Sequence, residues 1–141
     1  MRQLRQLSLF KGKRQRGVSA PAPLEYRNHC VIADLLKRWC NPHWRYTHMP
    51  AGERRDIITA ARLKRMGVKP GWPDFQFAGP GGVMFFLELK RKGSGRLSDE
   101  QADIVSHLAA CGFNILVTDS VDDAVATLKS FGILPSTIEV Q

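Results

Sequence analysis

The chain has 141 residues, 43% of them hydrophobic and 24% charged, a composition that suits one domain with a packed core. Its apolar runs are too short and too often interrupted by charge to span a bilayer, and no continuous apolar stretch follows the basic N-terminus, as a secretory signal requires. Its three cysteines form no CxxC pair and no zinc-like Cys/His spacing, so neither disulfides nor structural zinc is indicated. We therefore expect a soluble, cytoplasmic protein.

The net charge of +8 is unevenly distributed. Residues 1–72 hold 16 of the 21 lysines and arginines and only four acids, which gives them a charge of +12, whereas residues 73–141 come to −4. A polyanion would be bound mainly by the first half, and the acids of the second half include those able to bind a metal ion. A solvated basic surface is the alternative, and charge alone does not exclude it.

Residues 1–22 contain six basic residues and no acid, which predicts a flexible basic arm that follows a phosphate backbone, or a plain disordered tail. Over residues 24–39 the apolar spacing becomes helical. Glu25 precedes Ile32 by 7 residues and Leu36 by 11, so we expect it on the inward side of this helix.

A short strand is expected over residues 44–49, and a largely cationic helix over residues 53–66. Residues 74–77 and 83–90 are expected to be strands that pair as a hairpin, because the glycine-rich segment 79–82 between them predicts a turn. The first five residues of the second of these strands are all apolar, as in a strand covered on both faces.

A basic loop over residues 91–97 precedes a helix that starts at Ser98 with the spacing of a capping box and ends at Gly112. A strand over residues 113–117 and a helix over residues 121–131 follow. The predicted order is therefore helix, strand, helix, hairpin, helix, strand, helix.

The clearest chemical signal is Asp74, followed by the segment Glu88-Leu89-Lys90. Lys90 lies two residues beyond Glu88 along a strand and therefore projects to the same face. With the backbone carbonyl of Leu89, the two carboxylates would offer Mg²⁺ the oxygen ligands that it prefers. Such a site would assist phosphodiester hydrolysis, with Lys90 orienting the attacking water and contacting the phosphate.

Glu88 and Lys90 have an alternative interpretation as polar residues at an exposed strand end. The apolar run before them argues for a buried edge instead, where charged groups need a reason to be present. His29, one turn after Glu25, either faces the site or is structural. The remaining histidines have no spacing that recommends them as ligands: His43, His48 and His107.

Several residues are candidates for nucleic-acid contact. Five basic residues would contact phosphates or are only surface charges: Arg54, Arg55, Arg91, Lys92 and Arg96. Three aromatic residues would stack on unpaired bases or belong to the core: Trp44, Tyr46 and Trp72.

Four motifs together resemble the VRR-NUC branch of the PD-(D/E)xK nuclease superfamily: Gly71-Trp-Pro-Asp74, Phe85-Phe-Leu-Glu-Leu-Lys90, Gly95-Arg-Leu-Ser-Asp-Glu-Gln101 and Leu108-Ala-Ala-Cys-Gly112. A bare PD…ExK pattern occurs by chance, whereas these motifs in this order and spacing are fairly specific. The resemblance covers residues 24–131. It implies an α/β fold with a restriction-endonuclease-like PD-(D/E)xK core, in which helices flank a mixed central sheet of about four strands. The nuclease domain would span residues 23–134, between the arm and a C-terminal tail over residues 135–141.

The resemblance also implies roles for individual residues. Asp74 and Glu88 would be metal ligands and Lys90 the catalytic lysine. Glu25 would be the carboxylate that the first core helix often supplies, although the helix dipole also favours an acid there. Gln101 matches the polar residue at the start of the helix after the lysine, and a capping role is its alternative.

The function implied is that of an endodeoxyribonuclease that depends on Mg²⁺ or Mn²⁺ and acts on branched DNA, such as a Holliday junction or a flap. Compact members of this type are often phage-encoded and are expected to be homodimers. One alternative is a DNA-binding module that has lost the chemistry, which the presence of Glu25, Asp74, Glu88 and Lys90 argues against. Another is a nicking subunit of a phage replication, recombination or packaging complex.

Overall fold

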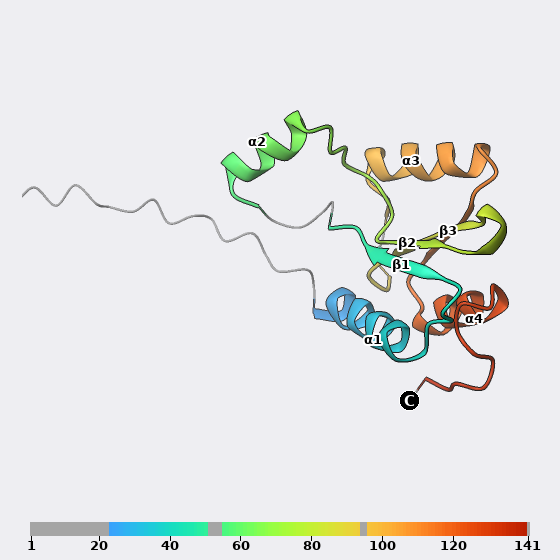
Figure 1. The fold of residues 1–141 in the computed structure, drawn as a ribbon. Coiled ribbons are helices and arrows are strands. Elements are labelled where there is room, and N and C mark those ends of the chain that lie inside the picture. Colours follow the sequence, from blue (N-terminus) through green and yellow to red (C-terminus); the bar gives the residue numbers. More distant parts are fainter. Residues whose placement is uncertain (1–22, 51–54, 94–95, 141) are drawn as a thin grey trace, which may run out of the picture.

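The computed structural model describes residues 23–50, 55–93 and 96–140. Figure 1 shows one mixed sheet with helices on both of its faces. The elements in chain order are α1 (Pro23–Trp39), β1 (Arg45–His48), α2 (Ile57–Arg65), β2 (Phe75–Ala78), the 3₁₀ turn η1 (Pro80–Gly82), β3 (Met84–Leu89), α3 (Asp99–Ala110), β4 (Asn114–Thr118) and α4 (Val121–Ser130).

The four strands lie side by side in the order β1-β2-β3-β4. The pairs β1–β2 and β2–β3 are antiparallel, and β3–β4 is parallel. The turn η1 closes the predicted hairpin, with Gly81 at φ +71° and Gly82 at φ +73°, a region that glycine enters without strain. Helix α3 supplies the crossover that a parallel pair of strands requires.

The apolar residues of β2 and β3 alternate between the two faces of the sheet. One face buries Phe75, Phe77, Phe85, Leu87 and Leu89. These side chains pack in the same core as buried residues of α1 and α4, which cover this face (Figure 1). The opposite face, under α3, carries the even-numbered residues of β3. Glu88 therefore lies on the α3 side of the sheet.

The structure confirms the predicted type and order of the elements. The predicted boundaries agree with the structure to within two residues except at one point, where the second helix begins at Ile57 and not at residue 53. Asp56 is its N-cap, since the Asp56 side chain accepts a hydrogen bond of 2.9 Å from the backbone N–H of Thr59. An aspartate inside the predicted range thus marks the true start of the helix.

The C-terminal residues 135–140 form no helix or strand, but Ile138 and Val140 pack against the core. Lys129 Nζ also donates a hydrogen bond to the carbonyl of Ile138. The predicted arm over residues 1–22 lies outside the described residues, and the predicted domain limits remain predictions. Among the described residues, no helix is long and apolar enough to cross a membrane.

Candidate active site

Asp74 and Glu88 meet at the end of the sheet where β2 begins and β3 ends. Because Phe75 pairs with Leu87 in antiparallel register, the preceding Asp74 falls opposite Glu88. The backbone N–H of Asp74 donates to Glu88 Oε2 at 3.2 Å, and that of Leu89 donates to Asp74 Oδ2 at 2.8 Å. Each carboxylate is therefore held by the backbone of the other strand.

The buried Glu88 forms an ion pair with Lys90, which is largely shielded from solvent. Glu88 is 2% exposed, and its Oε1 lies 2.6 Å from Lys90 Nζ. The Gln101 side chain bridges the pair, because its Nε2 donates to Glu88 Oε1 at 2.7 Å and its Oε1 accepts from Lys90 Nζ at 2.6 Å. The interpretation of Glu88 and Lys90 as an exposed strand end is thus wrong.

Gln101 also caps the helix on which it lies. Its backbone N–H donates to Ser98 Oγ at 3.2 Å, and its Oε1 accepts from the Ser98 N–H at 3.0 Å, which completes a capping box. Gln101 thus contacts Glu88 and Lys90 and caps α3 at the same time, and its role in catalysis stays a prediction. Gly71 packs directly against this turn, since a Cβ on Gly71 would lie 2.5 Å from the Glu100 carbonyl oxygen.

Two histidines flank Asp74. His29 Nε2 lies 3.4 Å from Asp74 Oδ2, which favours the prediction that His29 faces the site. His48 Nδ1 lies 2.9 Å from the Asp74 carbonyl oxygen, and because a carbonyl only accepts, the ring nitrogen is the donor. The two rings meet edge to face with centroids 5.5 Å apart. Sequence reasoning missed His48, whose only signal is its place at the end of a strand that pairs beside Asp74.

Burial dominates the electrostatics of Glu88. Desolvation, followed by the charge of Asp74, raises the pKa of Glu88 to about 7, and the neighbouring Lys90 opposes part of the rise. Burial and the charge of Asp74 therefore outweigh the stabilisation that Lys90 gives to the ionised form of Glu88. A further cation at this point would favour the ionised form of Glu88, so the charge of the site fits a metal ion.

Oxygen donors for such an ion are present. The N–H and C=O of one strand residue point to the same side, so the Leu89 carbonyl faces the side on which its N–H contacts Asp74. The Asp74 and Glu88 carboxylates and this carbonyl make a donor set of the kind that Mg²⁺ or Mn²⁺ accepts, with water filling the remaining positions. These residues thus fit a hard divalent cation.

Glu25 is half-buried on α1, one turn before His29. Burial is the largest single influence on the pKa of His29 and lowers it, but the contact with Asp74 acts in the opposite direction and the net shift is upward. The charges of Glu25 and Glu88 add to this rise. Within the described chain, no three His, Cys, Asp or Glu side chains gather closely enough to hold a metal ion, so Glu25 does not join the two carboxylates in one cluster.

The candidate nucleic-acid contacts divide into three groups. Arg91, Lys92 and Arg96 are exposed just beyond the end of β3. Arg55 is half-buried and donates to the Pro50 carbonyl at 2.9 Å. Arg54 lies outside the described residues.

The three aromatic candidates pack within the domain. Trp44 is a core residue at 7% exposure and stacks edge-on with Phe131. Tyr46 lies against Phe77, and Trp72 against Phe86. The core alternative is therefore correct for Trp44, and the other two residues have packing partners of their own.

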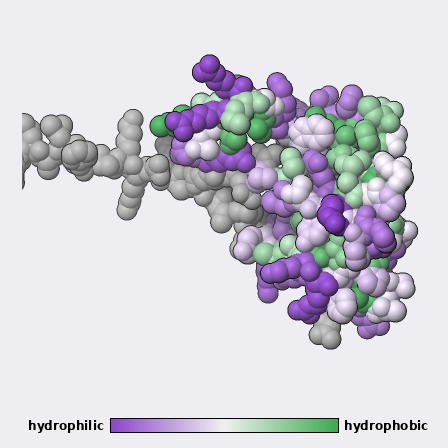
Figure 2. Space-filling view, in the orientation of Figure 1, coloured by the Kyte–Doolittle hydropathy of each residue, from purple (hydrophilic) through white to green (hydrophobic). Residues whose placement is uncertain are grey.

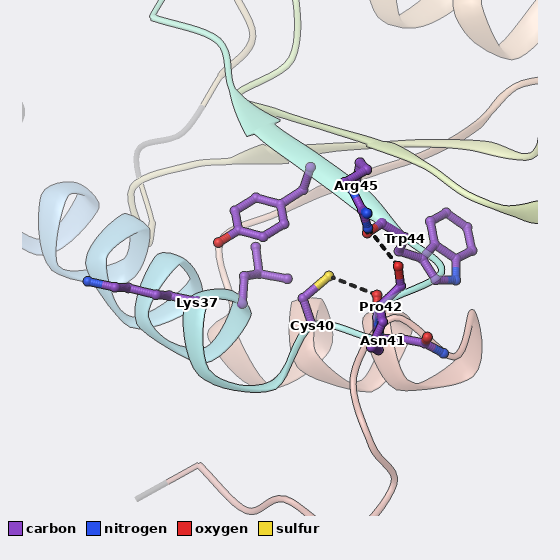
Figure 3. A pocket seen from close by; sticks show the side chains of 8 residues that line it. Lys37, Cys40, Asn41, Pro42, Trp44 and Arg45 are labelled. Carbon is purple, nitrogen blue, oxygen red and sulfur yellow. Dashed lines mark hydrogen bonds between the residues drawn. The ribbon is translucent and has the colours of Figure 1, made fainter.

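A separate hollow of about 300 Å³ lies where the end of α1 meets the start of β1 (Figure 3). Arg45 there donates to the carbonyls of Pro42 and Trp44, and Cys40 donates to that of Asn41. Burial raises the pKa of the Cys40 thiol, which makes it a poor nucleophile. The hollow contains no carboxylate, and its lining residues are Leu36, Lys37, Cys40, Asn41, Pro42, Trp44, Arg45 and Tyr46.

Solved structures share the fold of this chain, two VRR-NUC domains among them. One, a "VRR_NUC domain protein", superposes with a TM-score of 0.62 at 22% sequence identity, over 79% of this chain and 90% of that chain. Another, a "VRR_NUC domain", superposes with a TM-score of 0.53 at 18% identity, over 77% of this chain and 97% of that chain. No family model and no curated protein matches the sequence. The chain therefore has the VRR-NUC domain fold, and the α/β fold predicted from the motifs is confirmed.

Proposed function

We propose that this protein is an endonuclease that hydrolyses phosphodiester bonds of DNA with the help of Mg²⁺ or Mn²⁺. The observation that supports it most strongly is the buried Glu88–Lys90 pair, bridged by Gln101 and placed beside Asp74. Burying charged groups lowers stability even when they are paired, so a cluster of this kind is more typical of a functional site than of a plain core. The VRR-NUC domain fold agrees with this reading of the site.

The side chains of the site have distinct roles in the proposed reaction. Lys90 Nζ orients the attacking water and places a positive charge beside the scissile phosphate. Gln101 holds that ammonium group at 2.6 Å and so fixes where its charge lies. His29 and His48 hold the side chain and the backbone of Asp74 in place.

The metal ion would be held by Asp74, Glu88 and the Leu89 carbonyl, and Glu25 would add negative charge from outside this ligand set. When bound, the ion supplies Lewis-acid stabilisation of the charge that develops on the phosphate. Arg55, Arg91, Lys92 and Arg96, together with Arg54, would hold the flanking phosphates. The net charge of +8 agrees with a polyanionic substrate.

We also propose that the substrate is branched DNA, a Holliday junction or a flap, that the protein is a homodimer, and that it acts in the cytoplasm of a bacterium or a phage-infected cell. The basis is the resemblance to stand-alone VRR-NUC proteins. Two sites in one dimer would allow both strands of a junction to be cut.

The test is a cleavage assay on labelled linear, nicked, flapped and four-way DNA, with Mg²⁺, Mn²⁺ or a chelator. Asp74→Asn and Lys90→Ala are compared with Asp34→Asn and Lys37→Ala, which make the same changes at exposed positions on α1. We expect metal-dependent cutting that the site variants lose and the control variants keep. If every protein binds DNA equally and none cuts it, the protein is a binding module. Cutting that appears only with added phage proteins would favour the subunit of a larger complex.

A further inference from the structure

Helix α2 contributes almost nothing to the core. None of its residues is buried, and Figure 1 shows it standing apart from the sheet and the other helices. Ile57 is 88% exposed, and Met66, the C-cap, is 80% exposed. Nine residues are too few for a helix to be stable in water by its own hydrogen bonds. A short helix with little packing is expected to gain stability by contacting another molecule.

The charge of α2 indicates what that molecule is. Arg62, Lys64 and Arg65 are exposed, and the helix contains no acid. With 3.6 residues per turn, the three cations lie on the arc opposite Leu63, which is half-buried. Among the described residues, no ion pair engages these three cations. They are therefore available to an anionic partner.

The position of α2 connects it to the candidate site. The chain reaches α2 from the end of β1 at His48, and His48 pairs with Phe75 beside Asp74. After α2 it returns directly to Asp74 through residues 66–73. Both segments that connect α2 to the sheet therefore join it at the end where Asp74 lies. Figure 2 shows strongly hydrophilic side chains on this element beside hydrophobic ones.

We propose that α2 binds the phosphate backbone of the DNA on which the site acts, through Arg62, Lys64 and Arg65. The inference rests on the proposed function for the identity of the polyanion. Because the contact is electrostatic, it is independent of base sequence and weakens as salt rises. The exposed Ile57 and Ile58 of α2 suggest an alternative partner for this helix, a second copy of the chain. The experiment therefore has to distinguish DNA binding from self-association.

The experiment measures DNA binding by the full chain in EDTA, so that no cleavage is needed, over a range of salt concentrations. The variant Arg62→Gln/Arg65→Gln is compared with Lys37→Gln/Arg38→Gln, which removes the same charge from the last turn of α1. Each phosphate contact contributes about 0.9 to the slope of log K against log salt, so the α2 variant should lower the slope by about 1.8. Its affinity at about 0.1 M salt should fall at least tenfold, whereas the α1 control keeps the wild-type slope.

Single-stranded and duplex probes identify which form of DNA the helix holds. Sedimentation of the variant Ile57→Ser/Ile58→Ser measures whether these side chains are needed for self-association, and so tests the alternative that α2 binds a second copy of the chain. If this variant loses self-association while Arg62→Gln/Arg65→Gln binds DNA like the control, α2 is a protein interface and the inference is overturned. If the arginine variant loses affinity although no protein cuts DNA, the proposed catalysis fails and the inference stands. Normal cutting with unchanged binding by the arginine variant overturns the inference alone.

Discussion

Lys90 Nζ lies 2.6 Å from Glu88 Oε1, and both side chains are shielded from solvent, at 11% and 2% exposure. In this setting each charge depends on the other, because an unpaired buried ion is far more costly than a paired one. The pair therefore serves both the stability of the sheet end and the proposed chemistry.

Lys90→Ala should lower the free energy of unfolding by about 3 kcal/mol at pH 8, because it leaves the Glu88 carboxylate buried without its partner. At pH 5 the loss should be smaller, since the pKa of Glu88 is already raised to about 7 and its protonated form needs no partner. Urea denaturation at the two pH values measures the difference. Lys37→Ala, at an exposed position, is the control and should change stability little at either pH. Equal losses at both pH values for Lys90→Ala would contradict the buried pair.

Gly71→Ala should disturb the site from a distance. The new Cβ would meet the Glu100 carbonyl oxygen at 2.5 Å, and the backbone at Gly71 has φ +92°, so the first turn of α3 must shift. We expect a loss of about 2–3 kcal/mol in unfolding free energy, together with slower cleavage because Gln101 moves with that turn.

Gly81→Ala provides the matched control for Gly71→Ala. It also places an alanine at positive φ, +71°, but its Cβ would meet no atom within 4 Å. It should cost about 1 kcal/mol and leave cleavage unchanged. Equal effects of the two substitutions would show that φ alone matters and that Gly71 does not position α3.

The stability of the metal-free protein should depend on the protonation of Glu88. Its pKa is raised from 4.5 to about 7, so between these pH values the folded chain holds a proton that the unfolded chain has released. The stabilisation of the fold that comes from protonated Glu88 is therefore fully present below about pH 4.5 and is lost as pH rises through about 7. Denaturation in EDTA across this range should show a steeper fall with pH for the wild type than for Glu88→Gln. If the free energy of unfolding fell equally steeply with pH in both proteins, Glu88 would not be the cause of the pH dependence.

Mg²⁺ should stabilise the folded chain if Asp74 and Glu88 hold it. At an ion concentration about 100 times the dissociation constant, the unfolding free energy should rise by about 2.7 kcal/mol. Thermal unfolding with and without Mg²⁺ measures this rise, which Asp74→Asn should abolish and Asp34→Asn should retain. An equal rise in all three proteins would place the ion elsewhere.

Local sequence was sufficient for the parts of the fold and site that depend on spacing. The apolar run before Glu88 predicted a buried strand, and the two-residue interval to Lys90 predicted a shared face. His48 could not be recognised in this way, because its contact with Asp74 arises only when β1 pairs with β2.

The packing of Gly71 on α3 could not be predicted from the sequence either, because it brings together two segments that no local pattern connects. The start of α2 was misplaced because residues 53–56 contain two acids and their spacing did not identify Asp56 as the N-cap. For His48 and Gly71, what the sequence lacks is the relative placement of elements, which the packing of the whole sheet determines.

Gln101 both caps α3 and bridges Glu88 and Lys90, and these two roles together restrict which amino acids can replace it. A capping box is satisfied equally well by glutamate, and helix formation alone would not distinguish the two. A glutamate here would bring a third carboxylate to within about the 2.7 Å that now separates Gln101 Nε2 from Glu88 Oε1, and it would offer no donor. Glutamine can give a hydrogen bond to the acid and take one from the lysine, whereas an ionised glutamate can only accept. The glutamine at the third position of α3 is therefore explained by its contacts with Glu88 and Lys90, and not by helix capping alone.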